Sequence, residues 1–137
     1  MMTATTITQW IVRITGMTQV ALGLLFWTDR ALSLVPLHMA IGLTFVLGLW
    51  TLAGLAARAG LRPILVILAV GWGFVVPAFG MMQTRLLPGP WHWTVEVTHL
   101  LIGFVAMAVA ARLAGFIRKH PRAHSAGRTM DAVPLQG

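Results

Sequence analysis

The stretches PLHMAIGLTF (residues 36–45) and VTHLLIGFVA (residues 97–106) are apolar apart from one threonine and one histidine each. The histidines are His38 and His99, sixty-one residues apart, and each is followed by an isoleucine and a glycine at the third and fourth positions. Runs this apolar predict helices that lie in lipid. An imidazole is costly there and is by default a candidate for function.

The composition sets the class of protein. Of the 137 residues, 58% are hydrophobic and only 9% are charged, which is too few polar residues to cover a soluble domain of this size. The sequence therefore predicts an all-α polytopic membrane protein without a separate soluble domain. Cysteine is absent, which excludes disulfides, thiolate metal sites and covalent c-type heme attachment.

Four apolar segments are long enough to cross the roughly 30 Å hydrocarbon layer, and short loops between them favour an up-down bundle. They lie within one transmembrane domain, residues 1–119, and the expected spans are 7–28, 32–57, 63–83 and 91–117. Residues 120–137 show no apolar period and are expected to form a disordered, basic cytoplasmic tail.

The formal charge of +7 comes from nine arginines and one lysine, and most of them cluster near the ends of the apolar spans. We interpret them as topology determinants that also attract anionic membrane lipid, and we expect no nucleic-acid partner. Arg58 and Arg62 lie between the second and third spans, and Arg118 and Lys119 end the fourth. The positive-inside rule then predicts a bacterial-type inner membrane protein with both termini cytoplasmic. Arg13, two turns into the first span, is expected to extend toward the same face.

His38 and His99 are expected at one depth, in the outer half of the bilayer. In an up-down bundle their helices are diagonal and about 12–14 Å apart, too far for the imidazoles to touch. One iron porphyrin fits such a gap, with an imidazole on each face of the iron. Gly42 and Gly103, one turn beyond each histidine, would leave room for the macrocycle. The sequence therefore predicts heme b as cofactor.

Other polar residues near the histidines have several interpretations. Arg30 and Arg85, on the outer side, are expected to pair with heme propionates. Glu96 is the only acidic residue inside a span and lies on one helical face with His92 and His99. It could relay protons to a quinol, or hold the tautomer of His99 through a water. The spacing of these three residues would also allow a zinc, copper or non-heme iron site with His38 as a further ligand. His92, between two tryptophans, is interpreted as an interfacial residue.

Two of these segments resemble a known family. LHMAIGLTFVLGLW (37–50) resembles the heme-ligating helices of the heme A synthase group, and VEVTHLLIGF (95–104) resembles the Glu-x-x-His helix of the same group. The resemblance covers roughly a third of the chain. It implies a small four-helix membrane b-type cytochrome, like half of such a protein, with His38 and His99 as heme ligands. The motif order is reversed here, and Leu100 follows His99 where the family usually has arginine.

Three functions follow from these features. The first is an electron-transfer protein of the oxidoreductase class, which passes single electrons near the outer face and takes them from quinol or another redox protein. The second is an accessory subunit of a larger membrane complex. The third is a metal- or proton-coupled transporter that uses Glu96, His99 and His38. Small residues spaced four apart would also permit a homodimer.

The loop charges yield a topology prediction. Reporter fusions at the C-terminus and near Arg85 should label opposite sides of the membrane, with the C-terminus cytoplasmic. A periplasmic C-terminus would overturn this orientation and place the histidines in the inner half of the bilayer.

Overall fold

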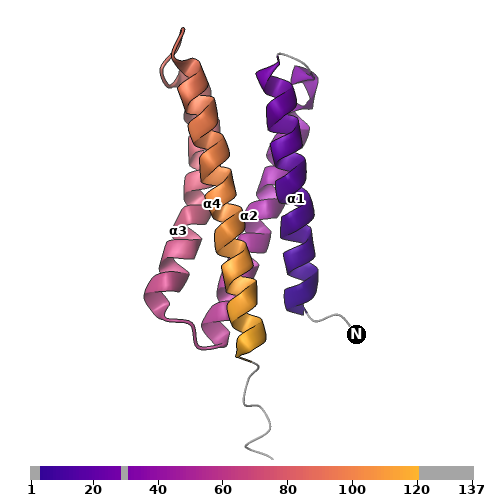
Figure 1. Ribbon diagram of the computed structural model, residues 1–137, viewed down its shortest axis with the longest axis vertical. Coiled ribbons are helices and arrows are strands. Elements are labelled where there is room, and N and C mark those ends of the chain that lie inside the picture. Colours follow the sequence, from indigo (N-terminus) through magenta and orange to yellow (C-terminus); the bar gives the residue numbers. More distant parts are fainter. Residues whose placement is uncertain (1–3, 29–30, 121–137) are drawn as a thin grey trace, which may run out of the picture.

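The computed structural model describes residues 4–28 and 31–120, and these form an all-helical bundle. The four main helices are α1 (Ala4–Trp27), α2 (Val35–Arg58), α3 (Pro63–Met82) and α4 (His92–Lys119). Short 3₁₀ turns, η1 (Leu32–Leu34) and η2 (Gln83–Arg85), lie before α2 and after α3. Figure 1 shows the helices running alternately up and down, and the predicted fold class is confirmed.

Each of the four helices, with α2 and α3 extended by their adjoining 3₁₀ turns, is long and apolar enough to cross a membrane. Large apolar side chains cover their outer surfaces, as suits a chain surrounded by lipid. Hydroxyl groups on these surfaces are satisfied within their own helices; for example, Thr44 Oγ1 donates to the carbonyl of Ala40 and Thr51 Oγ1 to that of Leu47. The expected tail, residues 120–137, lies outside the described residues except for His120.

Sequence-local features explain where the helices begin. Pro36 and Pro63 occupy the first turns of α2 and α3, where the missing backbone N–H has no partner to lose. Between α2 and α3 the chain turns through Gly60, whose φ of 92° is one that glycine adopts at low cost. The α3–α4 connection contains a second such glycine, Gly89, with φ 98°.

The packed core lies at one end of the bundle, which we call the core half (residues 4–16, 45–73 and 105–120). It is built from the lower part of α2 and α4 with contributions from α1 and α3, and its members are Val12, Phe45, Val46, Leu49, Leu52, Ala53, Ala56, Ala69, Ala106, Ala110, Leu113 and Ala114. Two tryptophans hold α3 in place across helices: Trp50 Nε1 donates to the carbonyl of Val70, and Trp72 Nε1 to that of Ile102, both at 3.1 Å.

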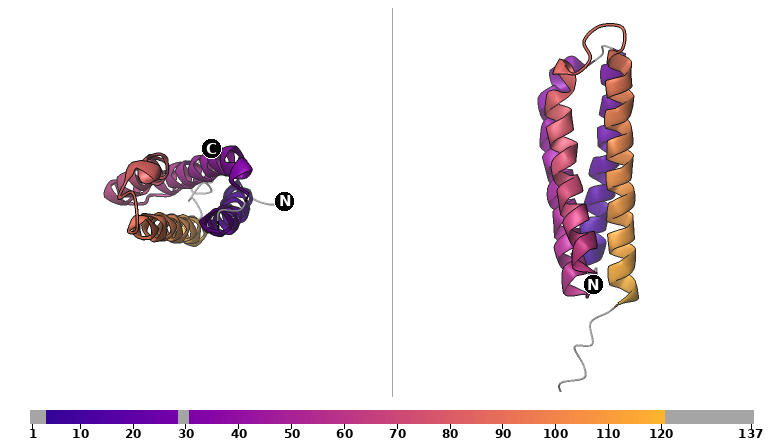
Figure 2. Two further views of the ribbon diagram at one scale, coloured as in Figure 1. Left: turned by 90° about the horizontal axis from the view of Figure 1, so that it is seen from above. Right: turned by 90° about the vertical axis from the view of Figure 1, so that its left-hand side faces the viewer.

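The other end is the histidine half (residues 17–28, 31–44 and 74–104). Of its described residues, Leu22 and Val95 alone are buried. Figure 1 shows the α1–α2 and α3–α4 hairpins diverging toward this end, and the two views of Figure 2 show the four helices arranged around a common axis. The bundle is thus tightly packed in one half and open in the other.

The prediction of a wide gap between α2 and α4 is wrong for the core half. Cα atoms of the two helices approach within 8 Å, and buried residues of both helices belong to the packed core of this half. The reason is the size of the facing residues, since Ala53 and Ala56 of α2 and Ala106 and Ala110 of α4 are fully or nearly fully buried. Alanine allows close approach of membrane helices, so the diagonal pair makes direct contact.

This packing predicts a difference between two alanines one turn apart on α2. Ala53→Leu should overfill the α2–α4 contact and destabilise the bundle by about 1–3 kcal/mol, because Ala53 is fully buried. Ala57→Leu is the matched control, since Ala57 is exposed. Thermal unfolding in detergent measures both. Equal melting temperatures for the two variants would contradict the assignment of this core.

Candidate heme-ligand site

His38 lies in the first turn of α2, in the histidine half. Its ring is half-buried and meets the ring of Phe26 from α1 edge to face, with the ring centres 5.3 Å apart. Nδ1 of His38 is buried and has no hydrogen-bond partner among the described residues. A buried polar atom without a partner costs roughly 1–3 kcal/mol, so this position is not explained by folding alone.

His99 lies two turns into α4 and is also half-buried. Its ring stacks on that of Phe79 from α3, with centres 6.0 Å apart and planes 9° from parallel. Gly80 makes room for the ring: a Cβ at this position would lie 3.0 Å from Cε1 of His99. Nδ1 of His99 is buried without a partner among the described residues, as in His38.

The two histidines thus occupy equivalent positions on separate hairpins. Each is on the second helix of its hairpin, and each contacts a phenylalanine from the first. Counted from Leu32 and from His92, where their helical segments begin, both lie roughly 10 Å along the axis. The structure therefore places the two residues that the sequence singled out at one level of the bundle.

Gln19 is a third polar residue in this half, and the sequence analysis missed it. Its Oε1 is buried and has no partner among the described residues. The amide lies against Gly42, where a Cβ would fall 2.5 Å from Nε2 of Gln19. A glutamine inside the apolar run of α1 was the available signal. Its role could not be predicted because the residue that it contacts, Gly42, lies on another helix.

The two predicted glycines behave differently. Gly42 faces the amide of Gln19, so the space next to it is already filled by a side chain. A Cβ at Gly103 would have no atom within 4 Å, so the volume beside this glycine is open. Gly80, which was not among the predicted site residues, is the glycine that admits an imidazole.

The remaining candidates lie apart from the pair. Glu96 is half-buried and makes no ion pair or hydrogen bond within the described part of the chain. His92 is half-buried in the first turn of α4, and its Nδ1 lies 3.1 Å from the carbonyl oxygen of Leu86, which anchors it to the α3–α4 connection. Arg85 is exposed in η2, and Arg30 lies outside the described residues.

The structure does not assemble the metal-site alternative. Within residues 4–28 and 31–120, no three histidine, aspartate or glutamate side chains are placed so that they could hold one metal ion. His38, Glu96 and His99 therefore do not form a three-ligand centre, and neither do His92, Glu96 and His99.

Comparison of the chain with models of known protein families, with curated proteins and with solved structures finds no match. The chemistry of the site has to be argued from its own residues.

The donor set fits an iron porphyrin. The macrocycle itself supplies four nitrogen ligands, so the protein needs to provide only two, one for each face. His38 and His99 each offer an imidazole that can bind iron in its neutral form. In each ring the buried Nδ1 has no hydrogen-bond partner among the described residues. An imidazole nitrogen is a common ligand of heme iron.

The glycines provide a test of this packing in the protein without cofactor. Gly80→Val should displace His99 and lower the melting temperature by several degrees, because its side chain enters the volume of the ring. Gly103→Val should leave the melting temperature almost unchanged, since nothing lies within 4 Å of its Cβ. Both substitutions replace glycine by valine and so carry the same small gain in intrinsic helix propensity. A larger loss in Gly103→Val than in Gly80→Val would show that the site is packed differently.

Proposed function

We propose that this protein is a one-heme b-type membrane cytochrome, with His38 and His99 as the two axial ligands. One observation carries the proposal: two imidazoles at the same level, on separate hairpins, each keep a buried nitrogen without a partner. They do so in the half of the bundle that has almost no packed core of its own. A shared group between the hairpins would supply both the missing partner and the missing contacts.

Non-covalent binding follows from the sequence, because the chain has no cysteine to form thioether bonds. Ligation by two histidines leaves no iron position open, which favours electron transfer over oxygen binding. When bound, heme b supplies a one-electron redox couple.

The chain's own residues have distinct roles in this proposal. Phe26 and Phe79 fix the planes of the two imidazoles and exclude water from them. Gly103, one turn after His99 on α4, has no side chain and leaves the volume next to it unfilled. Arg85, exposed in η2, pairs with a propionate at the membrane surface in this proposal. Arg30 lies outside the described residues, and its pairing with the other propionate stays a prediction from the sequence.

The electron donor proposed is a membrane quinol or another redox protein on the outer face. Quinol oxidation releases protons as well as electrons, so a nearby base is required. Glu96 is half-buried on the histidine-bearing helix and has no partner in the described residues, which suits a group that accepts such a proton. The orientation inferred from the loop arginines, with both termini cytoplasmic in a bacterial-type inner membrane, puts the histidine half at the outer side.

Absorption spectra of the purified protein test the proposal. Protein made in a heme-replete host should contain one heme per chain, with a low-spin spectrum in both oxidation states. His38→Ala and His99→Ala should each lose the heme or become high-spin. His92→Ala is the matched control and should keep the wild-type spectrum, because His92 is held by the connection to α3.

Two results would contradict the assignment. A colourless wild-type protein would remove the cytochrome interpretation and leave an accessory subunit or a transporter. Loss of the low-spin spectrum in His92→Ala alone would mean that α4 supplies a different ligand.

A further inference from the structure

A groove between α1 and α4 lies in the core half, away from the histidines. It consists of two adjoining depressions of about 230 and 560 Å³, which share Arg13 and Met107. Both are shallow and open to the outside of the bundle. Gln9, Val12, Ala108, Ala110 and Ala111 complete the first, and Trp10, Ile14, Met17 and Thr18 the second.

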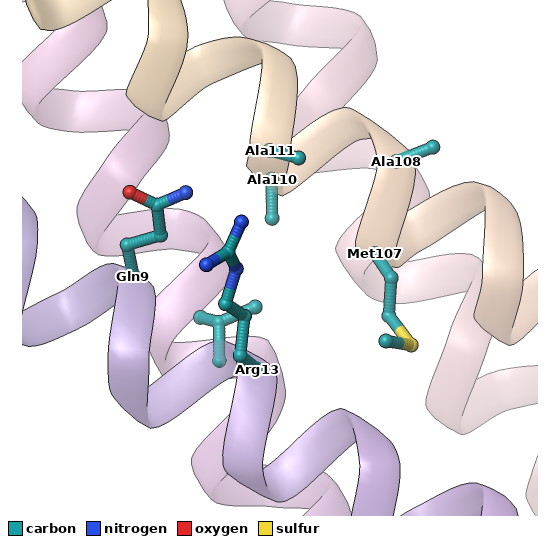
Figure 3. A pocket seen from close by; sticks show the side chains of 7 residues that line it. Gln9, Arg13, Met107, Ala108, Ala110 and Ala111 are labelled. Atoms are coloured by element: carbon teal, nitrogen blue, oxygen red, sulfur yellow. The ribbon is translucent and has the colours of Figure 1, made fainter.

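Arg13 is the charged residue of this groove. Figure 3 shows its guanidinium extending from α1 toward Ala110 of α4 and back toward Gln9. It lies over the ring of Trp10, 5.8 Å from the ring centre, and makes no ion pair within the described residues. Among the described residues, the only carboxylate side chain is that of Glu96, and it lies in the histidine half of the bundle. Arg13 is thus a cation inside an apolar span without an anion of its own.

A second cation, Arg118, is linked to the groove through Gln9. Arg118, near the end of α4, donates a hydrogen bond through Nη1 to Oε1 of Gln9. Gln9 is one helical turn before Arg13 on the same face of α1, and both line the smaller depression. Donor groups of Arg118, Gln9 and Arg13 therefore follow one another from the end of the bundle into the groove.

The rest of the groove is apolar. Met107 forms its floor on α4 and is half-buried, whereas Ile14 and Met17 form the α1 wall and are largely exposed. On the α4 side the groove is lined by the small side chains of Ala108 and Ala111, which leave it shallow. The groove therefore joins a cationic end with an apolar continuation, which matches a molecule that has an anionic head and a hydrocarbon chain.

We propose that this groove binds an anionic phospholipid. Arg13 and Arg118 hold its phosphate, Gln9 contributes its amide N–H groups, and one acyl chain lies along Met107, Ile14 and Met17. Guanidinium binds phosphate strongly because the two groups have opposite charges. In addition, its planar set of N–H donors matches the spacing of the phosphate oxygens. A phospholipid is also the anion that is available at the membrane face of two lipid-facing helices. This site is independent of the heme proposal.

Native mass spectrometry of the whole protein in detergent tests the site, with phosphatidylglycerol and phosphatidylcholine as probes. The wild type should retain phosphatidylglycerol at least roughly tenfold more strongly, because only that lipid has net negative charge. Arg13→Gln should lower its binding by roughly tenfold, and Arg13→Lys by less. Arg112→Gln is the matched control, since Arg112 is an exposed arginine of α4 that does not line the groove.

A second variant tests the apolar part without changing the charge. Ala108→Trp should block the groove and reduce lipid binding while the protein stays folded, because Ala108 is exposed. Equal losses in Arg13→Gln and Arg112→Gln would overturn the proposal, since binding would then follow net charge alone. Displacement of the lipid by millimolar inorganic phosphate would also overturn it, because the site would then recognise a free anion. Retention of phosphatidylcholine as strong as that of phosphatidylglycerol would do the same.

Discussion

The close contact of α2 with α4 in the core half is the constraint on which the other features depend. Alanines at the facing positions, such as Ala53 and Ala110, let these two helices touch, although they belong to different hairpins. From this contact the α1–α2 and α3–α4 hairpins diverge toward the other end of the bundle, as Figure 1 shows. The contact therefore decides both where the bundle is closed and where it is open.

The consequence for the histidine half is energetic. Three buried polar atoms there have no partner in the described residues: Oε1 of Gln19 and Nδ1 of His38 and of His99. In a medium that offers no water, such atoms destabilise the fold unless they gain a ligand. The core half supplies the stability that tolerates them. Phe26 meets the His38 ring edge to face, and Phe79 stacks on the His99 ring. This division between a packed half and a half with few buried residues would suit the proposed cofactor.

The sequence predicted the fold well and the site only in part. Long apolar runs bounded by proline, glycine and arginine specify four membrane-spanning helices by local physics, and His38 and His99 were conspicuous because imidazole is rare in such runs. The α2–α4 contact could not be predicted, because it depends on which alanines face each other after packing. Gln19, Phe26 and Phe79 were missed for the same reason: each gains its role from a residue on another helix. Arg13 was recognised as a cation near the membrane face, but its groove is formed jointly with α4.

Hydrogen–deuterium exchange of the protein with and without bound cofactor tests the central claim most directly, that one group links the two hairpins through His38 and His99. The account predicts slower exchange on cofactor binding in residues 35–44 of α2 and 92–102 of α4 together, with little change in the core half. Protection of only one of these segments, or equal protection along the whole bundle, would contradict it.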